Sequence, residues 1–259
     1  MNVTGLPPGY FEAFFLVLMR VGAAVATMPV ISSRNIPAPA KIGAAALLAF
    51  VLTPTAAGAP TPPKLGTPLP LAIGQELLIG VVFGFVVSLV YSGIQMAGQL
   101  LGIQMGFNIA NALDPVGQGG QLSYLDQLYA LIAGMIFLTV NGHHQVIQAL
   151  QQSFEIVPLG TFALGQAVAD DLVNLLAQAT IISIRIGLPV AAALFLTDVA
   201  FLIVGRTAPQ MNIFFVGQPV KVGVGLVTFF IALPAMVAYV TQVFGGIQRD
   251  LVQLLRTVG

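Results

Sequence analysis

Long apolar runs, separated by short polar or proline-containing stretches, dominate the hydrophobic pattern of the chain. Six of these runs approach or exceed the roughly 20 residues that a helix needs to cross a bilayer. They occupy residues 11–30, 42–59, 71–91, 125–140, 172–204 and 222–244. Apolar and polar positions do not alternate in repeated ten-residue segments, which disfavours an outer-membrane barrel. The pattern predicts an all-α integral membrane protein with about six long apolar helices.

The stretches between the runs contain the residues that usually end helices. Loops are expected at residues 32–41, 61–70 and 206–221. Pro158 and Gly160 break a mixed segment, and glycines mark a further loop at 108–123. Residues 244–259 place apolar side chains at steps of three and four, which predicts an amphipathic helix at the end. We expect residues 1–259 to form a single membrane domain with Gly- and Pro-broken segments.

Composition strengthens the membrane assignment. Of the 259 residues, 57% are hydrophobic and 7% are charged, and the mean hydropathy is +0.95. A soluble domain has about 25% charged residues, so most of this surface must face lipid or apolar protein. The net charge of zero without a basic run excludes electrostatic nucleic-acid binding. The first ten residues contain no Lys or Arg, so we expect no cleaved signal peptide.

Arg20, Glu76, Arg185 and Asp198 lie well inside the apolar runs, away from their ends. A charge at membrane depth is costly unless it is paired or hydrated, which makes each of them a functional candidate. One interpretation is a proton or ion pathway through Glu76 and Asp198, with the arginines as counter-ions. The other is a set of buried pairs, within the chain or with partner subunits. The absence of a repeated ladder of acidic residues favours the pairs.

No reactive constellation accompanies these charges. His143 and His144 are adjacent, and no further metal ligand stands nearby at helical spacing. The sequence has neither a Gly-x-Ser-x-Gly elbow nor a His-Glu-x-x-His pattern, and it has no cysteine. We therefore expect no enzyme activity, no metal site and no cofactor.

Glycines recur at intervals of four residues in the predicted helices. Gly98, Gly102 and Gly106 would fall on one helix face, and Gly80 and Gly84 repeat the spacing. Such ridges allow backbones to approach closely where lipid supplies no hydrophobic driving force. The ridges predict helix packing, either within this chain or against another subunit.

The segment before the loop at 108–123 combines uncharged polar side chains with methionine. Gln95, Gln99 and Gln104 must face protein or a water-filled cavity if they lie at membrane depth. Methionines such as Met105 adapt to irregular shapes. This combination suits a gate on a pore with nonspecific cargo, and a surface loop outside the membrane is the alternative.

Several sequence motifs follow one another over nearly the whole chain. They include Leu18-Met19-Arg20-Val21-Gly22, Gly102-Ile103-Gln104-Met105-Gly106 with Asp114-Pro115, Asn141-Gly142-His143, Ser153-Phe154, Pro158-Leu159-Gly160, and Arg206-Thr207-Ala208-Pro209-Gln210-Met211-Asn212. In these motifs the chain resembles the FliR/SctT family of type III protein export gates. The Gly-x-Gln-Met-Gly…Asp-Pro and Arg-x-x-Pro-Gln-x-Asn blocks are the specific parts.

The resemblance implies a core subunit of an export gate in the bacterial inner membrane, at the flagellar basal body. One copy would assemble with FliP-like and FliQ-like subunits into a channel for unfolded proteins, on which FlhB-like and FlhA-like proteins act. By position, the resemblance implies a plug that includes Met105, Gly106, Phe107, Asn108, Ile109, Asp114 and Pro115. An injectisome subunit of the same family is one alternative. A small-molecule or ion transporter is another, but the chain shows no internal repeat of broken helices.

A second motif is expected to act in docking or as a turn between the last two long helices. Pro209 has no backbone N–H to donate, and Gln210 and Asn212 can satisfy exposed backbone groups at helix ends. With Arg206, these residues form the expected assembly motif.

Overall fold

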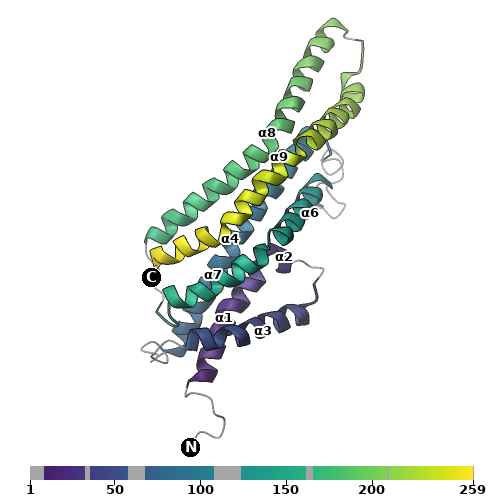
Figure 1. Cartoon of the computed structure of the whole chain (residues 1–259). Helices are drawn as coiled ribbons and strands as arrows, with labels where there is room; N and C mark the ends of the chain where they lie inside the picture. Colours follow the sequence, from purple (N-terminus) through teal and green to yellow (C-terminus); the bar gives the residue numbers. More distant parts are fainter. Residues whose placement is uncertain are drawn as a thin grey trace, which may run out of the picture. The chain divides into compact units, whose positions relative to one another are not determined.

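The computed structural model describes residues 9–32, 36–57, 68–107, 124–161, 166–208 and 210–258. All regular secondary structure in these ranges is helical, which confirms the all-α prediction (Figure 1). The helices are α1 (Tyr10–Thr27), α2 (Pro29–Ser32), α3 (Ala38–Ala57), α4 (Leu69–Gln104), α6 (Tyr124–Thr139), α7 (Gly142–Ile156), α8 (Gln166–Thr207) and α9 (Ile213–Val258).

Five helical segments are long and apolar enough to cross a membrane. They are Tyr10–Thr27, Ala38–Ala56, Leu69–Gln104, Val173–Thr207 and Phe215–Leu255. A sixth candidate is the pair Leu125–Thr139 and Gly142–Ile156, if these two helices count as one broken span. The expected count of about six is therefore confirmed by length and composition.

Two boundaries differ from the predictions at the C-terminal end of the chain. The loop expected at 206–221 ends early, because α9 begins at Ile213 and continues through Pro219 and Pro234. The amphipathic stretch at 244–259 is not a separate helix but the last part of α9. Glycine and proline are tolerated inside membrane helices, where neighbouring groups satisfy the freed backbone atoms. These residues are therefore weaker helix breakers here than the predictions assumed.

The chain divides into two compact units. The first unit comprises Met1–Leu89, Asn141–Leu176 and Gly245–Gly259, and the second comprises Val90–Val140 and Ala177–Phe244. Three long helices, α4, α8 and α9, are divided between the units, so that each contributes one segment to the first unit and one to the second.

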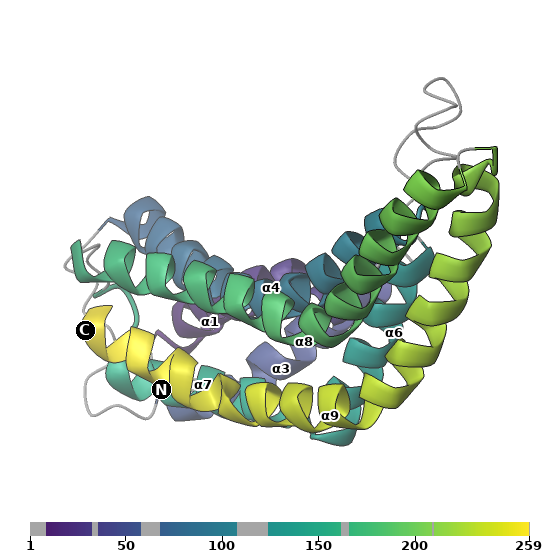
Figure 2. The same ribbon diagram turned by 90° about the horizontal axis from the view of Figure 1, so that it is seen from above.

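In the first unit, α3 packs against α1 and also contacts α7 (Figure 2). The buried residues of α1 recur at steps of three and four, as expected for one helix face turned to a core. They are Ala13, Leu16, Val17, Arg20, Val21, Ala24 and Val25. This buried face of α1 carries a charge, Arg20, in the middle of an apolar stripe.

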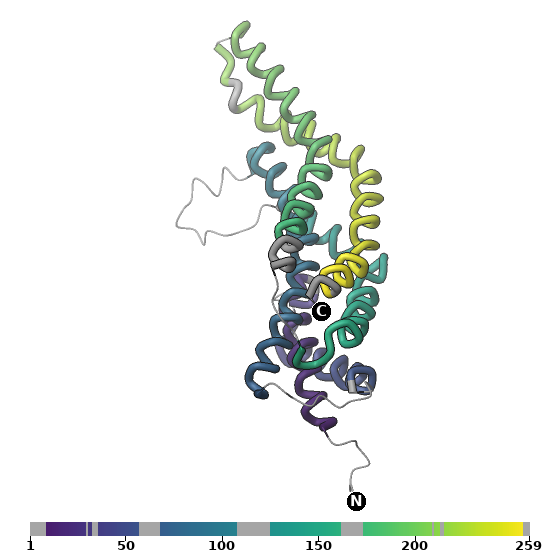
Figure 3. The backbone as a smooth tube through the Cα atoms, turned by 90° about the vertical axis from the view of Figure 1, so that its left-hand side faces the viewer, coloured from purple at the N-terminus to yellow at the C-terminus, as the bar shows by residue number. Residues whose placement is uncertain are grey.

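In the second unit, the last part of α8 and the first part of α9 run side by side as a hairpin (Figure 3). A Cβ at Gly217 of α9 would lie 3.7 Å from the ring of Phe201 of α8. The second unit also joins α4 to α6, because the Tyr91 hydroxyl donates to the Ala130 carbonyl at 2.7 Å.

Candidate functional site

Arg20 and Glu76 meet in a polar cluster inside the first unit. Arg20 Nε donates to Glu76 Oε2 at 2.6 Å, and Arg20 Nη2 donates to Glu76 Oε1 at 3.2 Å. Both side chains are completely buried. This bidentate geometry is the strongest form of an arginine–carboxylate pair.

The remaining donors of Arg20 reach the C-terminal end of α7. Nη1 donates to the carbonyl and the hydroxyl of Ser153, each at 3.0 Å, and Nη2 donates to the Val157 carbonyl at 3.0 Å. A guanidinium has five N–H donors, so every donor of Arg20 is used. The guanidinium carbon also lies 4.4 Å from the ring centre of Phe154. We call Arg20, Glu76, Ser153, Val157 and Gly160 the polar cluster.

Glu76 completes the polar cluster by holding the turn after α7. The backbone N–H of Gly160 donates to Glu76 Oε1 at 3.0 Å, and Gly160 has a positive φ of 75°. The cluster therefore ties α1, α4 and the end of α7 together within one unit. The cluster is suited to a structural role, because both Arg20 and Glu76 already have hydrogen-bond partners within the unit.

Close packing of α1 on α4 brings Arg20 and Glu76 within hydrogen-bonding distance of each other. A Cβ at Gly80 would collide with the Arg20 carbonyl oxygen, and a Cβ at Gly84 would collide with Thr27 Oγ1. Residues four apart share a helix face, so Glu76, Gly80 and Gly84 form one stripe of α4 that lies against α1. This use of Gly80 and Gly84 is packing within the chain.

The candidate plug begins directly at the end of α4, in the second unit. Phe107 N–H donates to the Gly102 carbonyl at 3.0 Å and Gly106 N–H donates to the Ile103 carbonyl at 3.1 Å. Gly106 has φ of 80°. This pair of bonds around a left-handed glycine is a Schellman motif, which ends a helix. Gly106 therefore ends α4. The prediction that it shares a helix face with Gly98 and Gly102 is wrong, because α4 ends at Gln104.

The other two glycines of that ridge stay inside α4. Gly98 and Gly102 are buried. A Cβ at Gly98 would lie 3.0 Å from the Leu125 carbonyl oxygen and 3.1 Å from Tyr129 Cβ of α6. Gly98 thus brings α4 and α6 together within the second unit.

Two contacts anchor the beginning of the plug segment on α9. Met105 is 2% exposed, and a Cβ at Gly225 would collide with its methyl group. A Cβ at Gly106 would collide with the side-chain oxygen of Gln218. Phe107, the next residue, is 36% exposed. Asn108, Ile109, Asp114 and Pro115 lie outside the described residues.

The assembly motif surrounds the connection between α8 and α9. Ala208 N–H donates to the Val204 carbonyl at 2.8 Å, and the Asn212 carbonyl accepts from Phe215 N–H at 3.2 Å. The side chains of Arg206, Gln210 and Asn212 are exposed. Pro209 lies outside the described residues. The turn presents these polar side chains outward.

Asp198 and Arg185, the two other candidate charges, also have neighbours within the second unit. Lys221 of α9 forms an ion pair with Asp198 of α8, and both side chains are partly exposed. The Arg185 guanidinium carbon lies 5.6 Å from the ring centre of Tyr239, within the range of a cation–π contact. The sequence indicated Arg20, Glu76, Arg185 and Asp198 as candidates but not their partners. These partners include Lys221 for Asp198, Ser153 and Val157 for Arg20, and Gly160 for Glu76.

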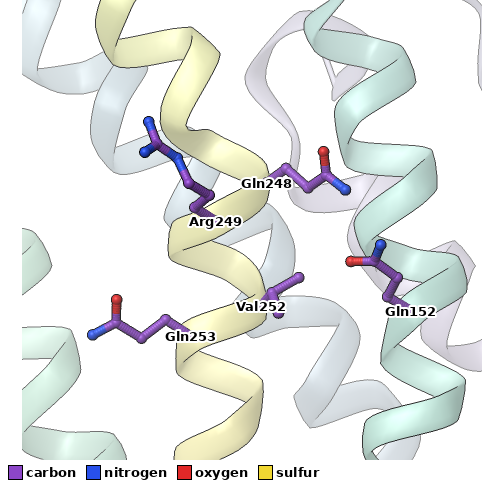
Figure 4. A pocket seen from close by; sticks show the side chains of 5 residues that line it. All are labelled: Gln152, Gln248, Arg249, Val252 and Gln253. Atoms are coloured by element: carbon purple, nitrogen blue, oxygen red, sulfur yellow. The ribbon is translucent and has the colours of Figure 1, made fainter.

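A polar cavity of about 490 Å³ lies between α7 and the last part of α9, in the first unit. Figure 4 shows Gln152 of α7 and Gln248 of α9 turned toward the space between the two helices. Arg249, Val252 and Gln253 complete its lining. These groups can hydrogen-bond, but they include no nucleophile, carboxylate or imidazole. Within the described part of the chain, no group of three His, Cys, Asp or Glu residues gathers as a metal site.

Comparisons with known proteins agree with the motifs. The family described as "Bacterial export proteins, family 1" matches residues 11–247. Flagellar biosynthetic protein FliR of Bacillus subtilis (strain 168) is 32% identical over 253 residues, which covers 96% of either chain. The proteins of the same name from Escherichia coli (strain K12) and Pectobacterium carotovorum are 27% and 30% identical, each over 95% of this chain and 94% of the relative.

Proposed function

This chain belongs to the family of bacterial export proteins, family 1, as a FliR-type member, and we propose on that premise that it is a membrane subunit of the flagellar protein export apparatus. The apolar helices suit a location in the inner membrane. The proposed role is structural and transporting, not catalytic.

The finer proposal is a core gate subunit that shares a channel with FliP-like and FliQ-like subunits. Unfolded flagellar proteins are the cargo, and FlhB-like and FlhA-like proteins act on the gate. A conduit for varied chains should lack fixed charges, since these would retain cargo of opposite charge. Residues 91–113 contain no charged side chain, which supports a position of this segment along the channel.

The observation that carries the gate proposal is the anchored start of the plug segment. A Schellman motif ends α4 at Gly106, and Met105 is buried against Gly225 of α9. Residues 108–123, which the sequence predicts to form a loop, therefore follow a fixed point. We propose that this loop closes the channel in the resting state.

Deletion of residues 109–120 tests the plug. The deletion leaves Met105, Gly106 and Phe107 in place, so α4 keeps its helix end. Leakage of small ions or dyes through the assembled complex should rise. Unchanged leakage in a complex of normal composition would count against the plug.

Native mass spectrometry separates the export gate from a transporter that acts alone. A C-terminally tagged chain is extracted gently from its native membrane, and the co-purifying proteins are weighed. One copy of this chain with several copies of two other small membrane proteins supports the gate. A monomer or a symmetric homo-oligomer favours the transporter and returns attention to Glu76 and Asp198.

The polar cluster fits the gate better than an ion pathway. Arg20 and Glu76 have no exposed surface, and all five donors of the guanidinium are engaged. A proton relay needs a side chain that can change its hydrogen-bond partner. Arg20 and Glu76 are instead bonded to each other and to the end of α7 and the turn after it. We propose that the polar cluster stabilises the first unit while cargo passes.

A further inference from the structure

An apolar groove of about 400 Å³ runs between α1 and α3 in the first unit. Leu18, Met19 and Gly22 line it from α1, Ile42 and Ala45 from α3, and Leu77 from α4. Its volume lies in the range of ligand pockets, about 300–1,000 Å³. Among the described residues that line the groove, Lys41 carries the one charge.

Small residues keep this groove open. A Cβ added at Gly22 would meet no atom within 4 Å, so the space continues to the backbone of α1. Ala23, Ala26, Ala38 and Ala45 also contribute to the walls. Ile42 is 69% exposed at the side of the groove. The groove is therefore an accessible apolar surface.

The charge of Lys41 lies toward one end of the groove. Lys41 stands in the first turn of α3, and its Nζ donates to the Ser32 carbonyl of α2 at 3.0 Å. Since α2 follows the end of α1, the ammonium lies toward the part of the groove lined by Ala26 and Ala38. Lysines near the ends of membrane helices extend their charge to the headgroup level.

The groove thus has apolar walls with one positive charge near one end. An anionic phospholipid has the complementary pattern, with an apolar chain and a negative phosphate at its end. Basic pockets between membrane helices are typical sites for acidic headgroups. We propose that this groove binds one acyl chain of an anionic phospholipid, with the phosphate at Lys41. The site goes beyond the proposed export function and does not depend on it.

Two glycine substitutions provide a matched test in the purified, assembled complex. Gly22→Leu fills the groove, whereas Gly43→Leu makes the same change on α3 at a position that does not line it. Neither glycine has an atom within 4 Å of an added Cβ, so the first side-chain atom meets no collision at either position. Lys41→Gln removes the charge and keeps the walls. Retention of phosphatidylglycerol and phosphatidylcholine from mixed micelles is measured by native mass spectrometry.

The wild type and Gly43→Leu should retain phosphatidylglycerol in preference to phosphatidylcholine. Gly22→Leu should weaken retention of both lipids by about tenfold or more. Lys41→Gln should lose the preference and still retain lipid. Equal lipid retention in Gly22→Leu and Gly43→Leu would overturn the proposal. Loss of co-purifying subunits in Gly22→Leu, with lipid retention unchanged, would also overturn it and assign the groove to a partner helix.

Discussion

Arg20 on α1 and Glu76 on α4 are 56 residues apart in sequence and form a bidentate ion pair, at 2.6 and 3.2 Å, with no exposed surface on either side chain. Both lie in segments apolar enough to span a membrane. The ion pair is therefore coupled to the packing of the two helices. Neither charge can be removed without leaving the other buried and unpaired.

Substitution of both members of this pair should be less harmful than the two single substitutions added together. Arg20→Met or Glu76→Leu should each destabilise the folded chain by about 3–5 kcal/mol, because a buried charge loses its partner. The double variant should be clearly less destabilised than the sum of the two. Thermal unfolding of the purified complex and the amount of chain in membranes are suitable measurements.

Glu12→Gln is the control for this cycle, because it removes an exposed carboxylate from the same helix α1. It should lower stability by no more than about 1 kcal/mol, because Glu12 lies in the first turn of α1, where a negative charge interacts favourably with the helix dipole. Additive losses in the double variant would contradict the coupling. An intact complex with Glu76→Gln that has lost transport alone would instead favour the ion pathway.

Gly80 offers a second test of the contact between α1 and α4. Gly80→Ala should destabilise the chain by about 1–3 kcal/mol, because the new methyl group would collide with the Arg20 carbonyl oxygen. Gly74→Ala is matched, since it lies on the same helix with no atom within 4 Å of the added Cβ. Gly74→Ala should be neutral or stabilising by up to about 1 kcal/mol. Equal thermal stability of the two variants would show that Gly80 does not set the distance between the helices.

The hydrophobic pattern was sufficient to predict the helices but not their ends. Runs of about 20 apolar residues predicted the all-α class and the approximate number of spans. The four-residue spacing from Gly102 predicts a helical position for Gly106, yet Gly106 adopts a positive φ just after the end of α4. Gly245 and Gly246 occur where a new helix was expected, and α9 continues through them. The local sequence did not distinguish these cases, because the surrounding packing decides them.

For the polar cluster, too, the sequence predicts one part and not the other. Arg20 and Glu76 could be identified from sequence, since a charge inside an apolar run is costly. Their pairing could not, because it depends on how Gly80 brings α4 against α1. Ser153 and Val157 contribute acceptors from a segment more than 130 residues away from Arg20. A single sequence contains no signal for such a distant backbone acceptor.

Gln210 tests the role of the turn between α8 and α9. Its side chain is exposed beside a turn whose backbone is already hydrogen-bonded, so Gln210→Ala should leave the fold of the chain intact. If the turn docks on another subunit, the variant should reduce assembly, measured as co-purified FliP-like and FliQ-like protein. Normal assembly with failed export would contradict the docking role. Arg249→Ala, an exposed change on α9 away from this turn, is a suitable control.

Gly106 allows the cost of its backbone conformation to be separated from the cost of a collision. Gly106→Ala should cost about 1–2 kcal/mol from the left-handed conformation alone, and its methyl group would also collide with the Gln218 side chain. Gly106→Ala with Gln218→Ala removes the collision and keeps the backbone strain. Gly106→Asn tolerates the conformation better. We expect leakage through the assembled complex to be highest in Gly106→Ala. Equal leakage in all three variants and the wild type would show that this turn does not set the position of the plug.

The contact between Met105 and Gly225 should control the resting state of the gate. Gly225→Leu places a side chain where the Met105 methyl group lies, so the start of the plug segment should move away from α9 and leakage should increase. Gly223→Leu makes the same change on α9 where an added Cβ meets no atom within 4 Å, and it should behave as wild type. Met105→Ala combined with Gly225→Leu exchanges the two volumes and should restore a closed channel. Leakage that rises equally in the Gly223 and Gly225 variants would reflect general damage to α9, and leakage that the double variant fails to lower would show that Met105 does not hold the plug.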